Sequence, residues 1–169
     1  GWAEQNPEEW WDAVCLATKE TIRKADIRPD EIAGIGIDGQ SWSAIAIDKE
    51  GKVLTNTPIW MDTRAQSICD RLNQEIGADK IFEVAGNSLQ PSYSTAKILW
   101  YKENLPEIYA KIDKILQSNS YIAYKLTDAV TQDVSQGYGL HCFDMKKGCW
   151  DEKMCKRLGI PMEFLPEIC

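Results

Sequence analysis

The sequence is poor in histidine and in cationic side chains, and it has no long apolar run. Its 169 residues include one histidine, and 19 Lys and Arg stand against 26 Asp and Glu, so the formal net charge is −7. Partners with a phosphate backbone or an anionic lipid surface require clustered Lys and Arg. No apolar segment approaches the roughly 20 residues that a membrane-spanning helix needs. We therefore expect neither nucleic acid nor membrane as a partner, which leaves small neutral substrates open.

The sequence also lacks cysteine and histidine residues at the spacing of metal ligands. The 6 cysteines are scattered, with no CxxC pair and no histidine at zinc-ligand spacing. We expect no metal ligand among the site residues. No secretory leader is recognisable, so we expect reduced thiols and a cytoplasmic location.

The composition excludes a disordered chain. Hydrophobic residues make up 44% and charged residues 27% of the sequence, as in ordinary globular proteins. This length suffices for one domain with its own core and is too short for two generous ones. We therefore expect residues 1–169 to form a single domain. The sequence opens at Gly1 without a Met and inside a helix-initiation pattern, so we expect a piece of a longer chain.

Helix and strand signals alternate along the chain, beginning with a helix. Asn6 followed by Pro7 is typical of an N-cap and a first helical position. Apolar residues then recur at three- and four-residue spacing to about Lys24, which predicts one buried helix face. After a polar break, the apolar residues 32–38 contain glycines and lead into an Asp-Gly pair. This pattern predicts a buried strand whose end opens into a site.

The rest of the chain continues the alternation. Residues 43–48 and 52–60 predict two strands of a β-hairpin, joined by the loop Asp-Lys-Glu-Gly. Asp62 is expected to cap a helix over residues 63–76. Further helices are predicted over residues 97–104, 107–114, 120–126 and 150–158, with a strand beginning at residue 115. This order is typical of the α/β class.

Residues 34–39 read Gly-Ile-Gly-Ile-Asp-Gly and match the GxGxxG dinucleotide fingerprint literally. That fingerprint must follow a strand and open a helix, whereas here the glycines lie within the predicted strand and another strand follows. The alternative interpretation, which we favour, is that Gly34 and Gly36 permit close backbone approach in a sheet.

The end of this predicted strand carries an acid, an amide, a hydroxyl and an indole, in the order Asp38, Gly39, Gln40, Ser41 and Trp42. Hydroxyl-rich ligands need paired donors and acceptors, and an aromatic plane covers the apolar face of a sugar. The cluster is therefore suited to a carbohydrate pocket. The alternative is a turn with satisfied hydrogen bonds and a core tryptophan.

A second dense group runs from Trp60 to Arg64 and places Asp62 two residues before an arginine. Arginine offers a fixed fork of donors for hydroxyls or carboxylates. The alternative is a helix cap with a surface ion pair of little energetic weight. For residues 133–137 and the lone His141, turn chemistry and a solvated or core histidine are favoured.

Taken together, these motifs resemble the N-terminal half of FGGY-type sugar kinases, the group of xylulose, glycerol, glucono- and ribulokinases. The resemblance spans nearly the whole chain. It is carried by residues 1–11 (GWAEQNPEEWW), 35–40 (IGIDGQ), 59–64 (IWMDTR) and 92–100 (SYSTAKILW). Each piece alone is weak, but four pieces in this order are specific.

The resemblance implies an actin-like ATPase or ribonuclease-H-like α/β domain, with a mixed sheet flanked by helices. It implies magnesium-dependent transfer of the ATP γ-phosphoryl group to a hydroxyl of a ketose, a polyol or a related sugar, with a xylulose-like sugar favoured. Such catalysis is mostly positioning and charge stabilisation. The implied partners are the sugar, the protein's own C-terminal domain and, in a homodimer, a second copy of the protein. The implied cofactors are ATP and Mg²⁺.

Carried over by position, the substrate-binding candidates are Gln40, Ser41 and Trp42, with Asp62 and Arg64 shaping the pocket. Ser92 aligns with a position where some members use an aromatic side chain. Lys97 and Trp100 match the family signature and are expected to serve packing and surface support.

Two departures from the family pattern limit these expectations. Xylulose kinases carry Met-His after Gly-Gln, where this chain has Ser41 and Trp42. The family's phosphate loop and catalytic Asp are not among these residues, and the base is expected in the C-terminal half. We therefore assign no catalytic residue and expect this chain alone to be inactive. The alternative function is a non-catalytic sugar-sensing domain of the same fold.

Overall fold

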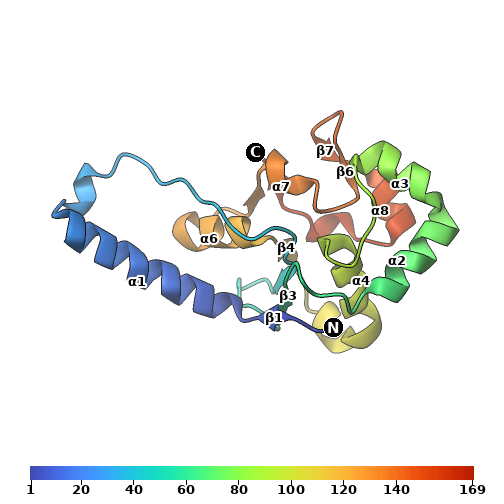
Figure 1. Ribbon diagram of the computed structural model, residues 1–169, viewed down its shortest axis with the longest axis horizontal. Coiled ribbons are helices and arrows are strands. Elements are labelled where there is room, and N and C mark those ends of the chain that lie inside the picture. Colours follow the sequence, from blue (N-terminus) through green and yellow to red (C-terminus); the bar gives the residue numbers. More distant parts are fainter.

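The first helix begins where the sequence predicts it. The Asn6 side chain accepts a hydrogen bond from the N–H of Glu8 at 3.1 Å, and Pro7 occupies the first turn of α1 (Pro7–Ala25). The helix ends at Asp26, whose φ of 52° is left-handed. In this computed structural model, which describes residues 1–169, α1 projects from the body as an arm (Figure 1). The predicted buried face is wrong for most of this length, because Pro7 alone is fully buried.

The chain returns along the arm as an extended, unpaired segment (Figure 1). After the short turn η1 (Pro29–Glu31), residues 33–38 contain no strand and make no backbone–backbone hydrogen bond. Ile35 is 65% exposed. The strand predicted over residues 32–38 is therefore wrong. An apolar extended backbone becomes a strand only when a second strand supplies the other half of the ladder, and no strand of this chain pairs with these residues.

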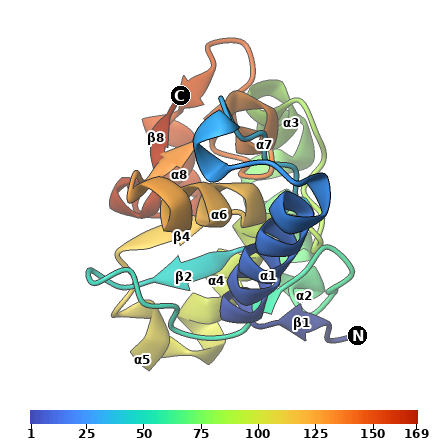
Figure 2. The same cartoon turned by 90° about the vertical axis from the view of Figure 1, so that its left-hand side faces the viewer.

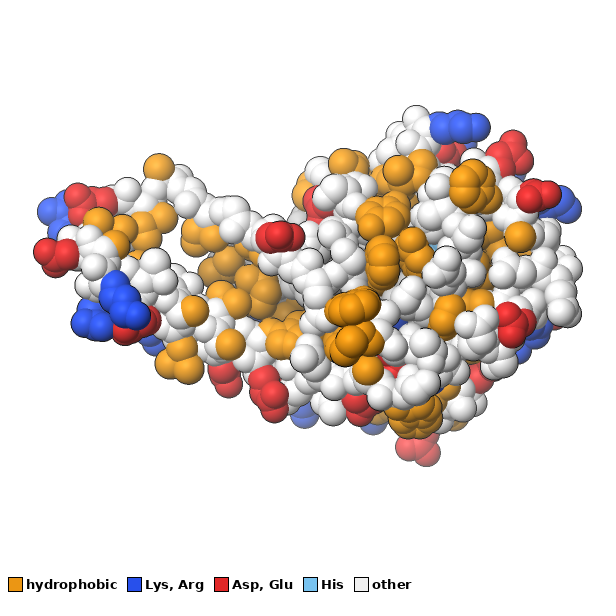
Figure 3. Space-filling view, viewed as in Figure 1, with side chains coloured by type: hydrophobic (Ala, Val, Ile, Leu, Met, Phe, Trp, Pro, Cys, Tyr) orange, Lys and Arg blue, Asp and Glu red, His pale blue; other side chains and the backbone are white.

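The arm and its returning segment enclose a hollow of about 720 Å³ that is lined mostly by apolar side chains. Figure 3 shows these side chains gathered along the inner side of the arm. Ile22 of α1, Ile32 and Ile35 of the returning segment, and Leu126 of α6 (Ser118–Thr127) are among them.

A short antiparallel pair divides the core of the body. Strand β2 (Ile45–Ile47) pairs with β4 (Lys114–Leu116), and Ile45 lies opposite Leu116. Side chains alternate across a strand. The larger apolar cluster accordingly contains Ala46 and Ile115, whereas the smaller one contains Ile45, Ile47 and Leu116. Every residue of β2 is buried, and β2 lies within the strand predicted over residues 43–48.

The remaining strands form three separate pairs. Strand β1 (Glu4–Gln5) pairs antiparallel with β3 (Thr57–Pro58), and β6 (Phe143–Asp144) pairs antiparallel with β7 (Cys149–Trp150). Strand β5 (Thr131–Gln132) pairs in parallel with β8 (Glu167–Ile168). The β-sheet structure is thus mixed, but it consists of four two-stranded ladders instead of one continuous sheet.

The predicted hairpin is correct only at its turn. Asp48 accepts a backbone hydrogen bond from Gly51, and one isolated bridge joins Ile47 to Val53. Beyond that bridge the chain leaves β2, and β3 pairs with the N-terminal strand β1. Turn chemistry is local, whereas the choice of pairing partner depends on packing at long sequence separation, so the hairpin interpretation failed where the local signal ended.

The helices of the body are α2 (Gln66–Leu72), α3 (Ala78–Ala85), α4 (Ser94–Asn104), α5 (Pro106–Tyr109), α6, α7 (Val134–Gly137) and α8 (Glu152–Leu158). A π-helical turn (Asn73–Gly77) links α2 to α3, and a 3₁₀ turn (Met162–Phe164) follows α8. The predicted helices over 97–104 and 120–126 are confirmed, and the one over 150–158 is confirmed from Glu152 onward, because Trp150 belongs to β7. The prediction over 107–114 is wrong beyond Tyr109, and α3 was not predicted.

Asp62 does not cap α2, because that helix begins at Gln66 after Ala65. Ile68 and Leu72 of α2 are buried as predicted. In Figure 2 the arm points toward the viewer, with α6 and the β2–β4 pair in the body behind it. None of the helices has both the length and the apolar character needed to span a lipid bilayer.

Candidate functional site

The loop from Gln40 to Trp42, which carries three of the predicted site residues, is held from the side of α6. The Ser118 hydroxyl donates a hydrogen bond to the carbonyl of Gln40, and the Gln117 side-chain oxygen accepts one from the N–H of Trp42 at 3.1 Å. Trp42 itself has a φ of 67°. A left-handed conformation is unusual for a bulky residue and persists only where the surroundings hold it. The loop is therefore a fixed structural feature.

Aromatic rings enclose the Trp42 side chain. The indole stacks on Tyr93 with ring centroids 4.3 Å apart, and Tyr138 meets it edge-on at 6.2 Å. The indole N–H is buried and has no hydrogen-bond partner. Tyr93 and Tyr138 were not predicted as site residues. Tyr93 lies inside the motif of residues 92–100, which was the only signal that could have pointed to it.

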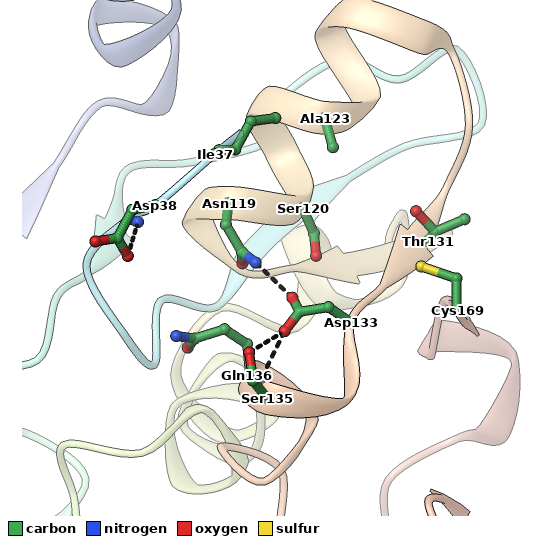
Figure 4. A pocket seen from close by; sticks show the side chains of 11 residues that line it. Ile37, Asp38, Asn119, Ser120, Ala123, Thr131, Asp133, Ser135, Gln136 and Cys169 are labelled. Carbon is green, nitrogen blue, oxygen red and sulfur yellow. Dashed lines mark hydrogen bonds between the residues drawn. The ribbon is translucent and has the colours of Figure 1, made fainter. Parts of the chain in front are cut away.

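A polar pocket of about 370 Å³ adjoins this loop (Figure 4). Its walls come from the end of the returning segment, from α6 and from the start of α7, and they include Asp38, Gly39, Asn119, Ser135 and Gln136. The Gln136 amide nitrogen lies 3.4 Å from the Ser41 hydroxyl, which connects the pocket to the predicted site. Cavity walls with amide, hydroxyl and carboxylate groups offer both donors and acceptors to a polyol.

Asp133 organises one wall of the pocket. It caps α7 by accepting the N–H of Gln136 at 2.9 Å, and it also accepts hydrogen bonds from Asn119 and Ser135. Burial alone would raise the pKa of Asp133, but these hydrogen bonds hold it below its usual value. The carboxylate is consequently ionised, and it accepts the hydrogen bond that caps α7. The buried side-chain oxygens Asn119 Oδ1 and Gln136 Oε1 have no partner in the protein. The turn chemistry predicted for residues 133–137 is confirmed.

Gln40 and Ser92 lie on either side of the Trp42 indole in sequence and have different surroundings. The Gln40 amide donates to the side chain of Gln5 at 2.9 Å, so the predicted ligand residue is tied to the N-terminal strand. Ser92 lies in the turn just before α4 and is half-buried. None of the predicted residues Gln40, Ser41, Trp42 and Ser92 lines the polar pocket itself, and Ser41 contacts its wall through Gln136.

Asp62 and Arg64 form a buried ion pair away from the pocket. Arg64 Nε lies 2.9 Å from Asp62 Oδ2, Glu4 accepts from the same guanidinium at 2.8 Å, and the N–H of Ala3 donates to Asp62 at 2.6 Å. Their side chains are 1% and 3% exposed, so the alternative of a surface ion pair is wrong. Burial alone would raise the pKa of Asp62, but hydrogen bonds from Arg64 and from backbone N–H groups hold it low.

Aromatic rings complete the surroundings of Arg64. Its guanidinium lies 4.1 Å from the Trp2 ring centroid and 4.9 Å from that of Trp100. Trp100 is almost fully buried, which confirms the packing role expected for it. The network therefore fastens the N-terminal residues and β1 to the segment after β3.

Lys97 was expected to serve packing and surface support, and the surface role is wrong. Its side chain has no exposed area, and Nζ donates to the carbonyl of Trp42 at 2.7 Å. Burial lowers the pKa of Lys97 to about 7, because the charged form loses its hydration, while the nearby carboxylate of Asp62 opposes this shift. Lys97 thus lies between the Asp62–Arg64 pair and the predicted sugar-binding loop.

His141 belongs to the core, which confirms one of the two interpretations given to it. Its Nε2 faces the carbonyl of Ser88 at 3.2 Å and must donate there, so Nδ1 accepts from the Thr95 hydroxyl at 3.0 Å. Burial lowers the pKa of His141 to about 4. The imidazole is therefore neutral near pH 7.

The donor set of this chain does not fit a metal ion. No three His, Cys, Asp or Glu side chains are placed together as metal ligands. None of the 6 cysteines is paired in a disulfide. The chemistry available at the loop and the pocket is hydrogen bonding to hydroxyl groups beside an aromatic wall.

Comparison with known proteins points to one group. The model of the FGGY family of carbohydrate kinases, N-terminal domain, matches residues 1–169. A glycerol kinase of Thermococcus kodakarensis is 33% identical over 172 residues, which cover 99% of this chain and 34% of the relative. A xylulose kinase of Bacillus subtilis is 27% identical over 168 residues, with 99% and 34% coverage.

Solved structures agree. The gluconate kinase from Lactobacillus acidophilus matches with a TM-score of 0.90 at 28% identity, and the xylulose kinase from Rhodospirillum rubrum with 0.89 at 26%. Each match covers 99% of this chain and 34% of the other. The chain thus spans about a third of the length of the relatives it matches.

Proposed function

Because the chain belongs to the FGGY family of carbohydrate kinases and has their actin-like ATPase fold, we propose that it supplies the sugar-recognising part of an ATP-dependent sugar kinase. The reaction is transfer of the γ-phosphoryl group of ATP to a hydroxyl of a ketose, a polyol or a related sugar, with a xylulose-like sugar favoured. One observation carries the proposal. A clamped loop with an aromatic side chain adjoins a polar pocket of about 370 Å³.

In this proposal the sugar lies against the loop from Gln40 to Trp42. Gln40 and Ser41 supply donors and acceptors for hydroxyl groups, and the indole of Trp42 covers the apolar face of the ring. Asn119 and Gln136 add two buried oxygens without protein partners, which are suited to accept hydrogen bonds from hydroxyl groups. Such a site recognises a neutral polyol in preference to an anion, because its walls contain carboxylates and no free cation.

Asp62, Arg64 and Ser92 have supporting roles in the proposal. The Asp62–Arg64 pair shapes the pocket indirectly, since the pair is buried and saturated with hydrogen bonds. Ser92 precedes α4 next to Tyr93, whose ring stacks on the site indole. Truncation of Ser92 should therefore affect sugar affinity less than truncation of Trp42.

The remaining parts of the reaction belong to the rest of the protein. The relatives are about three times as long as this chain, and we propose that residues 1–169 act as one domain together with a C-terminal domain. No residue described here is assigned as a base, as a magnesium ligand or as an ATP contact. In this arrangement the present chain binds and orients the sugar hydroxyl.

The test is ADP release by the whole protein with ATP, magnesium and a panel of ketoses, polyols and aldonic acids. Sugar-dependent ADP release supports the proposal and defines the substrate class. Sugar binding without any ADP release would favour the sensing domain, and absence of both would contradict the proposal.

Within that experiment, the variant W42A tests whether the sugar binds at the loop from Gln40 to Trp42. We expect its sugar affinity to fall about tenfold or more while ATP affinity stays unchanged, because aromatic contact with a ring contributes on the order of 1–3 kcal/mol. W60A is the matched control, since Trp60 is 51% exposed and lies outside the loop. Parental sugar affinity in W42A would contradict the assignment.

A further inference from the structure

Helix α4 presents a row of three donors to the backbone that follows the predicted sugar-binding loop. Ser94 Oγ, Lys97 Nζ and Tyr101 OH lie on one helix face, because residues three, four and seven apart share a face. They donate to the carbonyls of Ser43 at 3.0 Å, Trp42 at 2.7 Å and Ala44 at 2.9 Å. The three acceptors are consecutive residues.

This row replaces a β-ladder with side-chain donors. In a regular strand successive carbonyls point in opposite directions, so three consecutive carbonyls reach one helix only if the backbone departs from the strand. The left-handed φ of 67° at Trp42 provides that departure. A conformation of this kind costs about 1–3 kcal/mol for a residue with a side chain and must be held by its neighbours.

Lys97 makes the contact at the strained residue itself. Its Nζ is the donor that satisfies the Trp42 carbonyl, while Gln117 satisfies the Trp42 N–H from the opposite side. Lys97 has no exposed area and does not line the polar pocket. It therefore acts on the site only through Trp42.

Packing alone does not require a lysine at this position. A methionine fills a similar volume without the free-energy cost of removing an ammonium group from water. That cost is large here, because Lys97 forms no ion pair within 4.0 Å, although the charges of Asp62 and Arg64 act on it. The contribution specific to lysine is a donor at the end of a long stem that reaches the Trp42 carbonyl.

We propose that Lys97 is a positioning residue of the sugar site, which holds the Trp42 carbonyl and thereby fixes the left-handed turn that orients Gln40, Ser41 and Trp42. The effect expected on sugar binding rests on the proposed function. Its structural part, the fixing of the loop, does not depend on which ligand the loop takes.

The test compares K97M with K102M in the whole protein. Lys102 lies on the same helix but is exposed, so the two variants lose the same side chain from different surroundings. We expect K97M to lose about tenfold in sugar affinity, the order expected when a buried carbonyl loses its hydrogen-bond donor, with ATP affinity unchanged. K102M should keep both affinities. K97Q keeps an amide donor and should recover part of the sugar affinity that K97M loses.

A second readout keeps the inference separate from the proposed function. Amide hydrogen exchange of residues 40–44 should be faster in K97M than in the parent and unchanged in K102M. If the parent binds no sugar but exchange rises in K97M, the proposed function fails and the positioning role stands. If K97M folds with parental exchange and parental sugar affinity, the positioning role is overturned. Should K97M fail to fold, the same comparison is made with K97Q.

Discussion

Two apolar segments separated by a few residues have opposite environments in this molecule. Residues 32–37 lie along the arm without a ladder and are largely exposed, whereas β2 and the two residues before it are completely buried. Both segments are apolar in composition, and both have an extended backbone. The difference is that β2 has β4 on one edge and the side chains of α4 near its start. Burial is therefore decided by partners supplied from distant parts of the chain.

The same contrast holds for charged groups. The pair of Arg64 and Asp62 in the body is buried and shares its hydrogen bonds with Glu4 and the backbone. The pair of Arg23 and Glu20 on the arm is exposed on both sides. Geometry within the two pairs is similar, at 2.8 Å each. We therefore expect the contribution of each ion pair to stability to depend on its burial and on the surrounding hydrogen bonds, and not on the distance between its charged atoms.

The largest expected effect comes from breaking the buried pair. D62N should lower the free energy of unfolding by about 3–5 kcal/mol, since it leaves the Arg64 guanidinium buried beside a neutral amide. E20Q on the arm should change it by less than about 0.5 kcal/mol. Chemical denaturation followed by circular dichroism measures both. Equal effects of the two substitutions would show that burial does not separate the pairs.

A smaller effect should follow from truncating the buried strand. I45A removes a fully buried side chain and should cost about 2–5 kcal/mol. I35A removes the same atoms from the returning segment and should change stability by about 0.5 kcal/mol at most. A cost above 2 kcal/mol for I35A would mean that the returning segment is packed in solution.

The single histidine gives the body a pH dependence below neutral pH. The folded pKa of His141, about 4, lies below the unfolded value of about 6.5. The unfolded state therefore binds the extra proton between these values, and stability falls as the pH drops from about 6.5 to 4. H141Q should remove up to about 3 kcal/mol of that fall. Unfolding titrations of parent and variant at pH 7 and pH 4.5 measure the loss of unfolding free energy between the two pH values. An equal loss in parent and variant would contradict the prediction.

Local chemistry made part of the fold predictable. Asn6 and Pro7 marked the start of α1 without reference to the rest of the chain. Strand pairing was not predictable in this way, because β2 and β4 are far apart in sequence and β3 pairs with β1. Residues 32–38 gave a strand signal that only a pairing partner could have confirmed.

The same difference between local and long-range signals applies to the candidate site. The loop from Gln40 to Trp42 was predicted from its chemistry and from the family pattern, and its role in sugar binding stays a prediction. Its neighbours were missed because they come from elsewhere in the chain. The Ser41–Gln136 contact, for example, spans 95 residues. Lys97 was expected to serve packing and surface support, and its full burial could not be foreseen, because lysine is almost never fully buried.

The row of donors on α4 also has a consequence for the order of folding. Its three hydrogen bonds join residues that are 51, 55 and 57 positions apart. Closing loops of this size costs entropy before the contacts repay it, although each doubling of length adds only about 0.6 kcal/mol. During synthesis the loop of Trp42 leaves the ribosome well before α4 does. Its left-handed turn is therefore expected to form late, because a nascent chain that stops short of Tyr101 contains the loop from Gln40 to Trp42 without the side chains that hold it.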